Sequence, residues 1–155
     1  MAATDTFGNT LDLLKPKLGA IPLELRKIDN WVLWRALPAK DGRIRKVPFT
    51  PKGLLASSTD AATWSSFCDV SEAYARGGYA GVGFVVDRTT EVVGVDIDKL
   101  VAHKHQSEVK QVLLSLARSG TYVEWSPSGT GLRAFLLGNL PFTGKNNRTL
   151  GVEVY

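Results

Sequence analysis

Two aspartates that stand two positions apart, Asp96 and Asp98, are the residues best suited to chemistry in this sequence. They end the apolar segment 92–100, VVGVDIDKL, whose β-branched residues predict a buried strand. Side chains at i and i+2 share one face of a strand, so both carboxylates are expected together, with Gly94 leaving open space beside Asp96. Two like charges about 7 Å apart repel unless a cation lies between them, and oxygen ligands favour Mg²⁺ or Mn²⁺. The alternative is a strand that ends in a solvated acidic turn.

A loop rich in serine and glycine, SPSGTG at 126–131, precedes an arginine at position 133. Glycine permits positive φ and a close approach of the backbone, and successive N–H groups in such a turn can bind an anion. Ser126 and Ser128 add hydroxyl donors, and the Arg133 guanidinium suits phosphate. The segment is therefore a candidate phosphate site, and the alternative is an ordinary hairpin loop with a surface arginine.

A third carboxylate, Glu153, alternates with valines in the sequence GVEVY and is predicted to lie on a strand. Glutamates are common on edge strands, but Glu153 could also complete a metal-binding triad with Asp96 and Asp98. Carboxylates for metal ions and a phosphate-binding loop are the parts that two-metal nucleotidyl transfer needs. In that reaction one ion activates an attacking 3′-hydroxyl and the other stabilises the leaving pyrophosphate.

These residues require a sheet to position them. Strands are predicted at 31–35, 43–49, 81–86, 92–98, 122–125, 132–137 and 152–155, and helices at about 60–76 and 106–118. The first two strands are expected to form a hairpin, and so are strands 81–86 and 92–98. Thr59 or Asp60 is expected to cap the first of the two helices. The pattern predicts one α+β domain, residues 1–155, with a mostly antiparallel sheet.

Composition limits the class of protein. The chain has 155 residues, a net charge of +4 and a single cysteine, Cys68. A mildly basic chain permits a polyanionic partner, and one cysteine excludes an internal disulfide or a cysteine-rich zinc site. The sequence shows neither a signal peptide nor a membrane-spanning run, so a cytoplasmic protein is expected. Because natural domains seldom stop within a strand, we expect this chain to be a C-terminally truncated part of a longer protein.

The order of the segments WVLWR, RKVPFTPKG, TDAATWSSF, GVGFVV, VVGVDIDKL, YVEWSPSGTGLRAF and GVEVY resembles a known family. It is similar to the primase-polymerase domain of phage and plasmid replication proteins, within the archaeo-eukaryotic primase superfamily. The resemblance covers about residues 30–155. It implies an RRM-like antiparallel sheet with flanking helices and an added N-terminal α/β unit. It also implies synthesis of primers, and often extension of DNA, from nucleoside triphosphates on a single-stranded DNA template.

The resemblance also implies site residues and cofactors. The matching positions are the acidic pair Asp96 and Asp98, the serine turn at Ser126, Ser128 and Gly129, the basic residue Arg133 and the late acidic residue Glu153. The basic position is often histidine in the family, so Arg133 is a departure. Lys46, in the RKVPF segment, is the best candidate to contact nucleotide phosphate or the template backbone, and the alternative is a solvated basic hairpin. Mg²⁺ or Mn²⁺ is the implied cofactor, and a helicase domain or partner often accompanies such a domain.

Three other functions stay open at this point. The first is a non-catalytic module of the same fold that binds DNA or a protein partner during replication. The second is a nuclease or relaxase-type enzyme, although a relaxase needs a histidine cluster and this sequence has only His103 and His105. The third is a domain that binds a small phosphate-containing molecule and ignores DNA.

Overall fold

The structure is a computed structural model that describes residues 12–41, 43–100, 106–141 and 144–155. The chain divides into two compact units, residues 1–85 and residues 86–155. His103 and His105 lie outside the described residues. The interpretation of residues 1–155 as one catalytic domain stays a prediction.

The first unit contains a small antiparallel sheet with short helices. Its elements are η1 (Leu18–Ala20), α1 (Leu23–Arg26), β1 (Trp31–Pro38), β2 (Ile44–Phe49), η2 (Ala61–Thr63), α2 (Phe67–Ala75) and β3 (Gly81–Phe84). The strands pair in the order β2-β1-β3. The predicted hairpin of the first two strands is therefore confirmed, and apolar residues of β1 such as Leu33 are fully buried.

The single helix predicted from about residue 60 to residue 76 is wrong in its first half. Asp60 caps only the short η2, and Ser66 caps a separate helix, α2. Between them the backbone of Ser65 exchanges two hydrogen bonds with Trp31, at 2.9 and 3.1 Å. Pairing with β1 thus holds this segment extended, and a tertiary contact overrides the local helical preference.

The second unit is built on a larger sheet. Its elements are β4 (Val92–Ile97), α3 (Gln106–Arg118), β5 (Tyr122–Trp125), β6 (Leu132–Leu137), β7 (Lys145–Asn147) and β8 (Val152–Val154). The sheet has the order β5-β6-β4-β8-β7, and every neighbouring pair is antiparallel. The predicted hairpin of strands 81–86 and 92–98 is wrong, because β4 pairs on both sides with β6 and β8 while β3 pairs with β1.

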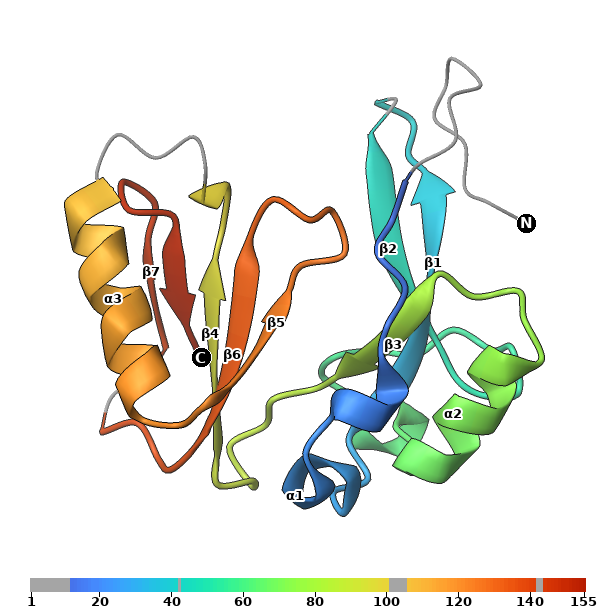
Figure 1. Cartoon of the computed structure of the whole chain (residues 1–155). Coiled ribbons are helices and arrows are strands. Elements are labelled where there is room, and N and C mark those ends of the chain that lie inside the picture. Colours follow the sequence, from blue (N-terminus) through green and yellow to red (C-terminus); the bar gives the residue numbers. More distant parts are fainter. Residues whose placement is uncertain (1–11, 42, 101–105, 142–143) are drawn as a thin grey trace. The chain divides into compact units, whose positions relative to one another are not determined.

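Helix α3 lies against one face of the five-stranded sheet (Figure 1). Val95 and Ile97 of β4 form a core there with Ala134 of β6 and with Val109 and Leu116 of α3. Gly120, with φ of +65°, follows the helix and ends it. An α+β fold with antiparallel sheets is confirmed, whereas its assignment to a primase catalytic core stays a prediction. None of the described helices is long and apolar enough to cross a membrane.

Candidate functional site

A row of polar residues crosses the second sheet from one edge to the other. The register pairs Glu124 with Arg133, Arg133 with Asp96, Asp96 with Glu153, and Glu153 with Asn146. Directly opposed residues of antiparallel strands point to the same face. Because side chains alternate along a strand, this face is the one opposite the α3 core. The row thus gathers residues from segments that are far apart in the sequence.

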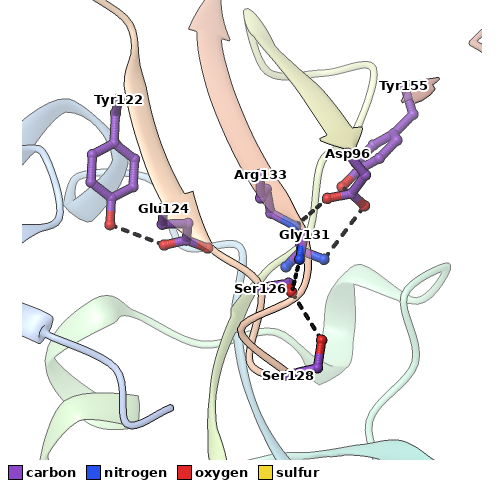
Figure 2. Close-up of polar contacts among 8 residues, drawn as sticks. All are labelled: Asp96, Tyr122, Glu124, Ser126, Ser128, Gly131, Arg133 and Tyr155. Carbon is purple, nitrogen blue, oxygen red and sulfur yellow. Dashed lines mark hydrogen bonds and ion pairs between the residues drawn. The ribbon is translucent and has the colours of Figure 1, made fainter. Parts of the chain in front are cut away.

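Asp96 lies in the middle of this polar row and has both carboxylate oxygens engaged (Figure 2). Arg133 donates from Nε to Oδ1 at 2.6 Å and, more weakly, from Nη2 to Oδ2 at 3.4 Å. The hydroxyl of Tyr155 donates to Oδ2 at 2.9 Å. The side chains of Arg133 and Asp96 are only 29% and 24% exposed, so solvent weakens this ion pair only in part.

The charges in the row affect one another. Burial acts to lower the pKa of Arg133, but the hydrogen bond and negative charge of Asp96 outweigh it, so the pKa is raised. Burial raises the pKa of Glu124, and the hydrogen bond from Tyr122 and the charge of Arg133 oppose that rise in part. Burial also raises the pKa of Tyr155. Arg133 and Tyr155 therefore remain protonated donors to Asp96 at neutral pH.

The space that was expected beside Gly94 is filled. A Cβ atom placed on Gly94 would lie 2.5 Å from the ring of Tyr155, so the aromatic ring occupies the room that glycine leaves. The two residues also exchange backbone hydrogen bonds of 2.8 and 3.0 Å. The expectation of open space next to Asp96 was wrong, because it did not take account of Tyr155, a large residue directly after the neighbouring strand β8.

The serine and glycine loop closes the hairpin between β5 and β6. Gly129 has φ of +71°, as the loop chemistry predicts, and the Ser126 hydroxyl accepts a hydrogen bond of 3.0 Å from the Gly131 N–H. Ser126 also shares a hydrogen bond of 3.0 Å with Ser128. Figure 2 shows this turn at the end of the strand that carries Arg133. The loop and the arginine therefore belong to one hairpin that leads to Asp96.

The carboxylates predicted to bind metal are brought together in part. Asp96 and Glu153 are direct cross-strand partners, which places their Cβ atoms about 4.5–5.5 Å apart. Asp98 is exposed and follows the last residue of β4, where its backbone N–H still bonds to Gly151 O at 2.8 Å. Within the described residues, no three side chains of His, Cys, Asp or Glu form a group that could hold a metal ion.

The donor chemistry nevertheless fits a hard divalent cation. Mg²⁺ in proteins is commonly held by one or two carboxylates together with substrate phosphates and water. The pair of Asp96 and Glu153 supplies two such carboxylates on neighbouring strands. The roles of Asp96, Asp98 and Glu153 in metal binding stay predictions.

Lys46 lies on β2 of the other unit, where its Nζ is 5.4 Å from the ring centroid of Trp34. The side chain is exposed. Its proposed contact with phosphate is not tested by this arrangement and stays a prediction.

A cavity of about 750 Å³ adjoins the polar row within the second unit. Its wall includes Glu153 and Tyr155 of the C-terminal segment, together with Arg88 and Asn139 from two connecting loops. Pockets of 300–1,000 Å³ are typical of small-molecule sites. The cavity thus offers space for a ligand next to Glu153.

Two members of this site were not identified from the sequence. Tyr155 could have been found, because the alternation that places Glu153 on one face of GVEVY places Tyr155 there too. Glu124 lies two positions after Tyr122 on β5 and accepts a hydrogen bond from its hydroxyl. It joins the polar row only because the register of β5 and β6 places it opposite Arg133. Nothing in the sequence alone indicates that register.

Comparison with known proteins finds a phage protein with a similar sequence. No protein-family model matches the sequence. Over 118 residues, which are 76% of this chain, the sequence is 31% identical to the DNA primase-polymerase of Nitratiruptor phage NrS-1. The chain is related to this primase-polymerase. The chain spans only about 16% of the length of that relative, so the activity of the whole phage protein does not transfer automatically.

Proposed function

We propose that this chain is the DNA primase/DNA polymerase domain of a replication protein from a mobile element, a phage or a plasmid. It joins nucleotides on a single-stranded DNA template and takes nucleoside triphosphates as substrates. The relationship to a phage primase-polymerase supports the class of reaction. The cytoplasm is the proposed location, and a helicase domain or partner is the proposed neighbour.

The observation that carries the proposal is the register of Arg133, Asp96 and Glu153 on three adjacent strands. Like charges directly opposite each other on a sheet are unfavourable. A pair such as Asp96 and Glu153 therefore calls for a cation, and Arg133 supplies one beside Asp96. The two carboxylates, Asp96 and Glu153, can bind cations, and the fixed positive charge of Arg133 can bind anions. This arrangement suits a substrate that itself carries both kinds of charge, such as a metal-bound triphosphate.

Asp96 and Glu153, with Asp98, are the residues that would hold Mg²⁺ or Mn²⁺. The ion would lower the pKa of an attacking hydroxyl and neutralise charge on the phosphates. The chain's own contribution is position and charge, which are the main sources of catalysis in phosphoryl transfer.

Arg133 is the proposed phosphate ligand of the site. Its guanidinium keeps its charge at all relevant pH values, unlike the histidine that is common in the related family. The turn at Ser126, Ser128 and Gly129 leads into the same strand and is the proposed neighbour of the triphosphate. The cavity beside Glu153 has a volume suited to the rest of a nucleotide.

Incorporation of labelled nucleotides on a single-stranded DNA template tests the proposal. The variants Asp96→Ala, Asp98→Ala and Glu153→Ala should each abolish synthesis. Glu91→Gln is the matched control, because Glu91 is an exposed acid directly before β4 and does not belong to the polar row. Unchanged synthesis by the Asp96→Ala and Asp98→Ala proteins would rule out this mechanism.

A second function is a non-catalytic module that binds DNA or a partner protein. The engagement of both Asp96 oxygens favours it, since that carboxylate is already neutralised by the protein itself. A protein of this kind would shift single-stranded DNA in a gel and incorporate no nucleotide with either Mg²⁺ or Mn²⁺. The two functions therefore separate in one experiment.

A further inference from the structure

The geometry points to Tyr155 as a positioning residue that fixes the Asp96 carboxylate in the orientation in which it binds a divalent cation. This inference rests on the proposed function, because it assigns Asp96 to metal binding. Tyr155 does not itself bind the ion in this scheme. It acts through the hydrogen bond from its hydroxyl to Oδ2 of Asp96, which measures 2.9 Å.

The two strands that carry these residues are matched position by position. Gly94 and Asp96 lie two positions apart on β4 and share one face, and the same holds for Glu153 on β8 and Tyr155 directly after it. Asp96 faces Glu153 in the register, and Gly94 exchanges two backbone hydrogen bonds with Tyr155. The smallest residue thus lies opposite a large aromatic one, directly next to the pair of acids.

Glycine at position 94 is what lets the tyrosine reach Asp96. A Cβ atom at Gly94 would approach three ring atoms of Tyr155 to 2.5–3.0 Å, which is closer than real contacts of that kind. The ring therefore packs over the glycine backbone, and its hydroxyl extends to the next residue on that face. The ring has little freedom to move, so the hydroxyl is a fixed donor.

The two hydrogen-bond donors to Asp96, Arg133 and Tyr155, differ in how they affect the binding of a metal ion to that carboxylate. Arg133 is a cation and competes with a metal ion for the carboxylate. Tyr155 is neutral and holds one lone pair of Oδ2, so it can remain bonded while a metal ion takes other lone pairs of the carboxylate. Groups that hydrogen-bond to a metal ligand commonly change metal affinity about 10–100-fold when they are removed. Tyr155 has the position and the chemistry of such a group.

The experiment is a titration of Mn²⁺ into the nucleotide-free protein, followed by electron paramagnetic resonance of the free ion. Tyr155→Phe removes only the hydroxyl and keeps the ring, and it should weaken Mn²⁺ binding about ten-fold. Tyr122→Phe is the matched control, because Tyr122 makes an equivalent hydrogen bond of 2.9 Å to Glu124 on the same sheet. That variant should change the Mn²⁺ affinity less than about two-fold, since Glu124 is not a proposed ligand. Circular dichroism confirms that each variant is folded.

Gly94→Ala gives an independent route to the same defect, because its methyl group displaces the ring. If Tyr155 acts through its hydroxyl, adding Tyr155→Phe to Gly94→Ala should cause no further loss of Mn²⁺ affinity. Wild-type affinity in Tyr155→Phe, or additive losses in the double variant, would overturn the positioning role. Failure of the wild-type protein to bind Mn²⁺ would instead overturn the proposed metal-dependent function, and the positioning role with it.

Discussion

Replacing Arg133 by methionine removes the cation that contacts Asp96 and keeps a side chain of similar length. The bond from Nε to Oδ1 is 2.6 Å long and links two side chains that are 29% and 24% exposed. A hydrogen bond between charged groups contributes about 1.5–3 kcal/mol to stability. Asp96 keeps the Tyr155 hydroxyl and some contact with water. We therefore expect Arg133→Met to lower the free energy of unfolding by about 2 kcal/mol.

The same variant should affect the two proposed ligands in opposite directions. A divalent ion about 4 Å from a guanidinium is repelled by about 2 kcal/mol even at the dielectric constant of water. Since about 1.4 kcal/mol corresponds to a factor of ten, Mn²⁺ binding without nucleotide should tighten about thirty-fold. Binding of a nucleoside triphosphate should weaken, because the phosphates lose their fixed cation.

Urea unfolding measures the first effect, and peptide-level hydrogen exchange over β4 and β6 locates it in the second unit. Arg43→Met is the matched control, because Arg43 forms an exposed ion pair with Asp41 at 3.2 Å and its side chain is 85% exposed. An exposed ion pair of this kind typically contributes about 0–1 kcal/mol to stability. Equal stability losses in the two variants would contradict the role of the Arg133 ion pair. Unchanged Mn²⁺ affinity in Arg133→Met would refute its competition with metal.

Three further predictions concern the residues around this pair. Gly131→Ala places a methyl group 2.5 Å from the Ile97 carbonyl oxygen, so it should destabilise the second unit by about 1–3 kcal/mol in urea unfolding, as overpacking does. Ser126→Ala removes the acceptor of the Gly131 N–H and should cost about 1 kcal/mol in the same assay, whereas Ser126→Thr, which retains the hydroxyl, should cost less. Glu124 has a raised pKa in the folded protein, so folding favours its protonated form and stability falls as pH rises through that pKa. Glu124→Gln should therefore flatten the acid side of the stability profile, and a profile identical to wild type would refute this assignment.

The sequence was sufficient to predict elements whose signals are local. The strands at Tyr122–Trp125 and Leu132–Leu137 and the helix Gln106–Arg118 lie where alternation, helical spacing and turn residues indicate. The position of Gly129 in a left-handed turn follows from the same local chemistry. Such signals depend on residues close in the chain, so no knowledge of the partner strands is needed.

Pairing between distant strands was not predictable in the same way. The apolar runs at 81–86 and 92–98 suit a hairpin as well as two separate strands, and only the competition of β6 and β8 for β4 decides between them. The ring of Tyr155 over Gly94 depends on the same pairing. The candidate site was therefore predicted as a set of residue types, whereas the contact of Arg133 with Asp96 required the register.

The long sequence separations within the polar row have a consequence for the order of folding. Asp96 receives its donors from residues 37 and 59 positions further along the chain. Loop closure over such distances is slow compared with formation of a local hairpin such as β5–β6. On the ribosome, Asp96 leaves the exit tunnel long before Tyr155 does, so the nascent chain carries an unassembled acidic strand until its last partner has been synthesised.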